Sequence, residues 1–134
     1  MREILFKAKR IDNGEWVEGF YQFSDWIYPT TGELAERKYY IRPIRSQDAY
    51  EVNPDTICQY TGLADKNGNK IWENDIIRHY NKSWEPNVYT EGIIKWNTFE
   101  CRFENCSIKN PCNTYTINPT CNYEVIGNIF DNAG

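Results

Sequence analysis

The chain has 134 residues, 40% hydrophobic and 25% charged, so its composition predicts one folded globular domain and excludes a disordered or membrane-embedded chain. Aromatic residues make up 16%, an enrichment that favours strands over helices. The net charge of −4 is divided equally between residues 1–64 and 65–134, and the pI is near 5.0. Neither half therefore carries the basic footprint of a polyanion-binding protein.

The N-terminal ten residues mix charged and apolar side chains and lack the uninterrupted apolar run of a signal peptide. No segment approaches the roughly 20 consecutive apolar residues that a membrane helix requires. We therefore expect a cytoplasmic protein with no membrane association, and the sequence predicts no cofactor.

Alternation of apolar and polar residues with a period of two predicts strands along the whole chain. Asn13-Gly14 favours a hairpin turn, after which residues 15–23 form the return strand. Residues 46–51 form at most a short helical turn. Further predicted strands cover residues 37–44, 56–63, 75–80, 88–96, 99–106, 114–117 and 123–130. This gives about nine short strands and no sustained helical period.

The stretch "LADKNGNKIWEND" at residues 63–75 raises the question of a calcium site, because Asp65, Asn67 and Asn69 alternate like the ligands of an EF-hand loop. An EF-hand starting at Asp65 requires glycine at its sixth position and glutamate at its twelfth, and the chain has Lys70 and Ile76 there. Asn67-Gly68, by contrast, is typical of a tight hairpin turn.

We therefore interpret this stretch as a structural turn in which Gly68 has positive φ and no metal is bound. We expect Gly68→Ala to cost about 1 kcal/mol or more, and Asp65→Ala to cost less.

Three segments resemble the YopX protein family, which is found mostly in bacteriophages and prophages. They are "MREILFKAKRIDNGEWVEG" at the N-terminus, "QYTGLADKNGNKIWENDII" followed by "GIIKW" in the centre, and "YEVIGNIF" near the end. The family pattern has glycine where this chain has Asn74, before Asp75 in a second structural turn. Asparagine is the residue that best replaces glycine in a left-handed conformation.

The resemblance implies a mainly β protein with a small barrel in its C-terminal half, and it implies no activity. Gly92, inside a predicted strand, independently fits the sharp coil at a barrel corner. We therefore expect one unit over residues 1–134, with little helix. N-terminal antiparallel hairpins in residues 1–55 would pack with a small barrel of SH3-like type in residues 56–131.

Four of the five cysteines cluster within 21 residues, at Cys101, Cys106, Cys112 and Cys121. Zinc is a weak alternative here, because the spacing contains no Cys-x-x-Cys pair that could grip a metal from one turn. We predict ordinary thiols and no metal site.

One strand combines basic and aromatic residues, the pattern that single-strand nucleic-acid binders use for phosphates and bases. Its candidate binding residues are Arg37, Lys38, Tyr39, Tyr40, Arg42 and Arg45. Strand alternation separates them, since Arg37 and Arg45 share a face with Tyr39, while the others point the opposite way. The acidic pI also opposes polyanions. An edge strand protected by charge is the competing interpretation.

The single histidine, His79, could act as a general base, but no serine or cysteine lies near it in sequence. A strand histidine with no catalytic role is the simpler interpretation, and we predict no catalytic residues.

The aromatic surplus is the other functional feature. Trp16, Trp26, Trp72, Trp84 and Trp96, together with ten tyrosines, exceed what one small core easily hides. We therefore predict a non-enzymatic assembly or protein-binding module of phage or prophage type, forming a homo-oligomer or binding another protein. Single-stranded nucleic-acid binding is the alternative, and an enzyme using His79 is the third hypothesis.

Overall fold

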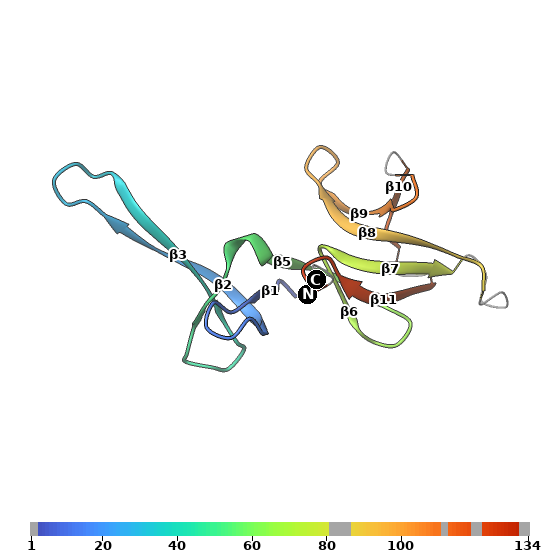
Figure 1. The fold of residues 1–134 in the computed structure, drawn as a ribbon, viewed down its shortest axis with the longest axis horizontal. Coiled ribbons are helices and arrows are strands. Elements are labelled where there is room, and N and C mark those ends of the chain that lie inside the picture. The colour runs from blue at the N-terminus through green and yellow to red at the C-terminus, as the bar shows by residue number, and fades with distance from the viewer. Residues whose placement is uncertain (1–2, 81–86, 111–112, 119–121, 132–134) are drawn as a thin grey trace. The chain divides into compact units, whose positions relative to one another are not determined.

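A computed structural model describes residues 3–80, 87–110, 113–118 and 122–131 (Figure 1). These residues form strands and one short 3₁₀ turn, η1 (Pro54–Thr56), so the prediction of a mainly β chain with little helix is confirmed. None of the described residues belongs to a helix long and apolar enough to cross a membrane. The strands are β1 (Phe6–Lys9), β2 (Trp16–Ile27), β3 (Leu34–Arg42), β4 (Tyr50–Glu51), β5 (Cys58–Ala64), β6 (Lys70–Trp72), β7 (Asp75–Tyr80), β8 (Tyr89–Asn97), β9 (Arg102–Ser107), β10 (Thr114–Thr116) and β11 (Asn122–Asn128).

The chain divides into two compact units, Met1–Gln59 and Tyr60–Gly134. The division falls inside β5, whereas the sequence places it between residues 55 and 56. All strand pairs are antiparallel, and β5 pairs with β1 through Cys58 and Gln59 before it pairs with β6. The first sheet has the order β4-β3-β2-β1-β5-β6. β4 lies within residues 46–51, where the sequence predicts at most a helical turn.

The first unit is organised around the β2–β3 hairpin and a small core. The fully buried side chains of Ala8, Ile41 and Val52 form this core, and Val17 and Ile57 pack against it. The buried positions lie near the base of the hairpin, where β1 covers one edge of β2 and β4 covers one edge of β3. The core therefore holds the base of the hairpin only.

The outer part of the hairpin extends past both neighbouring strands (Figure 1). β1 pairs with β2 only from Trp16 to Gly19, and β4 pairs with β3 only at Tyr40 and Ile41. Residues 20–27 of β2 pair with β3 alone. The hairpin is thus a two-stranded ribbon over most of its length.

The second unit contains a five-stranded sheet of order β10-β9-β8-β7-β11. Its core is formed by Ile71, Ile77, Ile94 and Tyr123, with several partly buried apolar side chains packed against them. Alternation places Ile77, Ile94 and Tyr123 on the same face, because Ile77 pairs with Val125 and His79 pairs with Tyr123. This face of the sheet is buried, which agrees with the alternation of apolar and polar residues from which the strands are predicted.

The small closed barrel of SH3-like type is not found. Among the described residues, β10 pairs only with β9 and β11 pairs only with β7, so the two outermost strands do not close the sheet. β10 spans three residues, all exposed. Gly92 has a different role from a barrel corner, because a Cβ there would overlap the side chain of Asn105 on β9.

The turn between β5 and β6 is built around the carboxylate of Asp65. The N–H of Asp65 donates to the carbonyl of Asn69 (2.8 Å), and Gly68 has the left-handed φ of 84° that the sequence predicts. One Asp65 oxygen, Oδ1, accepts the N–H groups of Asn67 and Asn69, both at 2.9 Å. The other oxygen, Oδ2, accepts the N–H of Val125 on β11 at 3.0 Å. The carboxylate thus joins the turn to a strand that is distant in sequence.

A second buried carboxylate, Asp75, fixes the turn between β6 and β7. It accepts the N–H of Trp72 (2.8 Å) and the side-chain amide of Asn128 (3.0 Å). Asn74 has φ of 70°, so asparagine takes a left-handed conformation where the family pattern has glycine. Its N–H donates to the carbonyl of Ile94. This turn therefore connects β6, β8 and β11.

These contacts reverse the expected order of two substitutions. Gly68→Ala should lower the free energy of unfolding by about 1 kcal/mol, because alanine is strained in a left-handed backbone conformation. A Cβ at this position would meet no atom within 4 Å, so no steric clash adds to this cost. Asp65→Ala should lower it by about 3 kcal/mol, because three backbone N–H groups lose a buried acceptor. Urea denaturation measures both, with exposed Asp55→Ala as the control for loss of one negative charge. A larger loss for Gly68→Ala would contradict this account.

The same carboxylate gives a pH dependence. Burial raises the pKa of Asp65, but the N–H groups of Val125, Asn69 and Asn67 outweigh it, so the pKa lies below the ordinary value. A folded-state pKa below the unfolded value of about 3.9 stabilises the fold above that pH. This contribution should be lost as pH falls below about 4, and Asp65→Asn should reduce the loss. If Asp65→Asn loses as much stability at acid pH as the unaltered chain, Asp65 is not the source of this pH dependence.

Candidate functional site: the exposed β2–β3 arm

The outer part of the β2–β3 hairpin exposes an unusual amount of apolar surface. We define the arm as residues 20–39, which comprise the outer parts of β2 and β3 and the turn between them. Every residue from 20 to 34 is exposed. Seven of these are large hydrophobic side chains, namely Phe20, Tyr21, Phe23, Trp26, Ile27, Tyr28 and Leu34, and Trp26 is 64% exposed. Contiguous apolar exposure of this kind marks interaction surfaces.

One face of the arm carries a row of aromatic contacts. Tyr21 pairs with Ile41 and Phe23 pairs with Tyr39, which places these side chains together. The ring of Tyr21 stacks with that of Tyr39 at 6.3 Å between centroids, and it contacts Phe6 at 5.6 Å. This row continues the small core outward along one face, so the arm is stiffened on that side.

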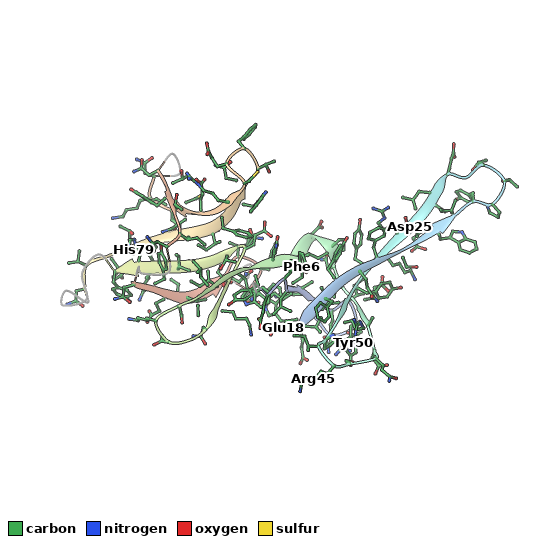
Figure 2. All side chains as sticks on the ribbon, turned by 180° about the vertical axis from the view of Figure 1, so that it is seen from behind. Phe6, Glu18, Asp25, Arg45, Tyr50 and His79 are labelled. Carbon is green, nitrogen blue, oxygen red and sulfur yellow. The ribbon has the colours of Figure 1, made fainter. Side chains whose placement is uncertain are left out.

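An ion pair ends the aromatic row toward the tip. Arg37 donates two hydrogen bonds to the carboxylate of Asp25, Nε to Oδ1 at 2.6 Å and the terminal nitrogen to Oδ2 at 2.9 Å (Asp25 is labelled in Figure 2). Its guanidinium also lies over the ring of Phe23, 4.2 Å from the centroid. The hydrogen bond from Arg37 lowers the pKa of Asp25 and, reciprocally, raises that of Arg37. Asp25 is thereby neutralised within the arm.

The register separates the predicted nucleic-acid residues. Arg37 and Tyr39 are on the aromatic face, and Arg37 is engaged by Asp25. Lys38, Tyr40 and Arg42 share the opposite face, opposite Ser24, Gln22 and Phe20 in that order. Arg42 donates to the carbonyl of Ser46 at 3.1 Å.

Arg45 follows β3 with φ of 64°, and it lies toward the other end of the hairpin from Asp25 (Figure 2). The six residues therefore do not form one surface. Three of them, Lys38, Tyr40 and Arg42, do share a basic and aromatic face.

The residues that sequence reasoning missed lie on β2. The predicted strand ends at residue 23, but β2 continues to Ile27, and its outer part is exposed on both faces. The sequence identifies Trp26 only as one of the surplus aromatic residues and gives it no place in the fold. A signal was available, since residues 19–31 contain only one charged side chain, Asp25. A long strand without charge is typical of a buried strand, and only the structure reveals that its outer part is uncovered.

A groove in the second unit contains His79 (labelled in Figure 2). Its volume is about 610 Å³, and it is lined by His79, Thr90, Thr114, Tyr115, Thr116, Asn118 and Tyr123. None of these side chains is an acid, a lysine or an arginine. The ring of His79 contacts that of Tyr123 at 5.0 Å, and the hydroxyl of Tyr123 accepts the N–H of Asn118. The described lining residues bring hydroxyl groups near His79, and none of them is a carboxylate that would orient it as a base.

The cysteines that suggested zinc are only partly described. Cys101 is exposed, with its thiol near the carbonyl of Thr98, and Cys106 is half-buried on β9. Burial raises the pKa of the Cys106 thiol. Cys112 and Cys121 lie outside the described residues. Within the described ranges, no group of three His, Cys, Asp or Glu side chains could hold a metal ion.

The fold and its features define a mainly β protein with two open antiparallel sheets and an exposed hairpin arm. The chain belongs to the YopX protein family, whose model matches residues 5–134. A solved structure, protein EF1440 from Enterococcus faecalis, is similar with 20% identity and a TM-score of 0.48. That similarity covers 98% of this chain and 96% of the other chain. The search of curated proteins found no match.

His79 allows a direct titration because it is the single histidine of the chain. Burial lowers its pKa, so we expect a neutral ring at pH 7 and a folded-state pKa below the unfolded value of about 6.5. Stability should then decline as pH falls below about 6.5, because protonation favours the unfolded state. NMR of the ring protons in tag-free protein, compared with the same protein in urea, measures both pKa values. A folded pKa at or above the unfolded one would overturn this interpretation.

Proposed function

We propose that this YopX protein is a non-enzymatic assembly module that self-associates through the arm. The observation that carries the proposal is the run of exposed residues 20–34, which holds seven large hydrophobic side chains on a ribbon of two strands. An isolated two-stranded hairpin is only marginally stable in water, and additional strands or a packed face stabilise it. A partner that covers the arm would supply both.

Aromatic composition supports a protein partner. Phe, Tyr and Trp are enriched in the cores of protein interfaces, where they contribute much of the binding free energy. On outer β2 they lie beside a single charged side chain, Asp25, which is already paired with Arg37. Two arms can therefore approach each other through β2 without bringing an unpaired charge into the contact. A second copy of the chain is the partner that the neutral outer part of β2 fits.

The biological setting is part of the same proposal. The resemblance to the YopX family favours a phage or prophage protein that acts in the cytoplasm, where an assembly module would meet other copies of itself during expression. A pull-down from prophage-induced cells, using the intact chain and a variant with the arm altered, identifies further partners that depend on the arm.

Single-stranded nucleic acid is the second candidate, and the face shared by Lys38, Tyr40 and Arg42 supports it. Such binding would weaken with salt, since phosphate contacts release counterions. Fluorescence anisotropy with a labelled single-stranded oligonucleotide at low salt tests it. Binding that falls in Arg42→Ala would favour this function, and absence of binding at low salt would exclude it.

An enzyme using His79 is the third candidate, and activity in a substrate screen that is lost in His79→Ala would support it.

Self-association should depend on the exposed aromatic residues of the arm. We expect sedimentation equilibrium to find dimers at high micromolar concentration, and Trp26→Ser to weaken association by about tenfold or more through loss of buried apolar area. Phe99→Ser is the matched control, because Phe99 is 97% exposed in the turn between β8 and β9 and lies outside the arm. This control should associate like the unaltered chain.

Two results would contradict the proposal. The unaltered protein could remain strictly monomeric at high micromolar concentration, or Phe99→Ser could weaken association as much as Trp26→Ser. Circular dichroism of each variant verifies that a loss of association does not come from unfolding.

A further inference from the structure

In the part of the chain that the structure describes, no strand faces the backbone groups along one edge of outer β2. The direction of these groups follows from β3, where the carbonyl of Tyr39 accepts the N–H of Val52 at 2.9 Å and so points away from β2. In an antiparallel pair, directly opposite residues either exchange both hydrogen bonds or exchange none. Tyr39 is opposite Phe23, so the N–H and C=O of Phe23 point away from β3 as well.

The same alternation extends along β2. Tyr21, Phe23 and Asp25 direct their backbone groups to the free edge, whereas Gln22 and Ser24 direct theirs to β3. The base of the strand confirms this phase, because the carbonyl of Glu15 accepts the N–H of Arg10 at the end of β1. The N–H and C=O groups of odd-numbered residues thus face β1 until β1 ends opposite Gly19, and beyond that point they face none of the described strands.

The two edges of the arm differ in how they are protected against strand pairing. The outer part of β3 carries Glu36, Arg37 and Lys38, and charged side chains are a common device for blocking an edge. The outer part of β2, residues 20–27, carries Asp25 alone, and the ion pair with Arg37 compensates its charge. β2 therefore presents a long, unprotected edge.

We infer that a second copy of this chain adds its own β2 to this edge, antiparallel and centred on Phe23, so that two arms form one four-stranded sheet. The inference rests on the proposed self-association and specifies its geometry. Centring on Phe23 places Tyr21 opposite Asp25 of the partner, so all three edge-facing residues gain hydrogen bonds in both copies. It also places the two Phe23 side chains directly opposite each other, an aromatic cross-strand pair.

This pairing removes the weakness of the isolated ribbon. A sheet of four strands satisfies the unpaired N–H and C=O groups of β2, and it exceeds the three strands that stable sheets usually require. The contact is isologous, so the same edge serves both copies and the assembly closes as a dimer. The charged edge of β3 remains outermost, where it blocks further growth of the sheet.

Amide hydrogen exchange measured by NMR tests the pairing directly. At high concentration the amides of Tyr21, Phe23 and Asp25 should exchange about tenfold or more slowly than at low micromolar concentration, because only pairing between copies protects them. The amides of Gln22 and Ser24 serve as internal controls, since they already face β3 and should change little. Sedimentation equilibrium on the same samples gives the fraction of dimer.

A pair of variants at one position separates the backbone from the side chain. Phe23→Pro removes an edge N–H that makes no bond to β3, and proline is tolerated on an edge strand. Phe23→Ala removes the ring and keeps the N–H. The proline variant should therefore associate about tenfold more weakly than the alanine variant, while both keep the arm folded. Ser24→Pro, which removes an N–H directed at β3, should instead disrupt the arm itself.

The outcomes distinguish this inference from the proposed function. Dimers whose Tyr21, Phe23 and Asp25 amides still exchange rapidly would overturn strand addition and leave self-association through the arm standing. Equal association of Phe23→Pro and Phe23→Ala would overturn it in the same way. A strict monomer would overturn both proposals. Concentration-dependent protection of these amides, with the proline variant weaker, supports both.

Discussion

A single ladder of backbone hydrogen bonds holds the outer half of the β2–β3 hairpin, and the proposed self-association rests on this constraint. Because β1 ends opposite Gly19 and β4 reaches only Tyr40, residues 20–27 have one neighbouring strand. Side-chain contacts supplement that ladder, through the rings around Tyr21 and the ion pair of Arg37 with Asp25. They stiffen one face and leave the edge of β2 without a hydrogen-bond partner in the described strands. These contacts stabilise the arm, and the N–H and C=O groups along the edge of β2 are free to pair with a further strand.

The second unit satisfies its backbone groups in a different way. Two buried carboxylates, Asp65 and Asp75, accept hydrogen bonds from backbone N–H groups that have no partner in the strand ladders. Asp65 also accepts the N–H of Val125 on β11, and Asp75 accepts the side-chain amide of Asn128 on β11. Each turn is thereby connected to a strand that is distant in sequence. Residues that alternate like calcium ligands in the sequence therefore organise the protein's own backbone. Without these two carboxylates the N–H groups at the turns would lose their acceptors, which explains why the two positions carry acids.

Strands with a clear period of two could be predicted from the sequence, because one buried face imposes alternation on them. The turns could be predicted as well, since Gly68 and Asn74 are residue types that tolerate a left-handed backbone. Pairing partners could not, because the outcome depends on which distant strands are long enough to meet. The expected barrel is open because, among the described residues, the outermost strands β10 and β11 do not pair with each other. The exposure of Trp26 could not be predicted either, since a strand with few charges has the same sequence pattern whether it is buried or exposed.

The candidate binding strand illustrates the same limit. In the sequence, Arg37, Tyr39 and their neighbours resemble a nucleic-acid-binding surface. In the fold, pairing of β3 with β2 places Arg37 against the carboxylate of Asp25. The opposite strand, β2, carries the candidate interaction surface, since its outer edge is neutral and meets no other strand among the described residues. The central claim is that this edge of β2 joins two copies of the chain. An isotope-filtered NOE experiment on dimers of labelled and unlabelled chains tests it most directly. The account predicts a contact between the Hα atoms of Gln22 in one copy and Ser24 in the other, and a dimer that lacks this contact would contradict it.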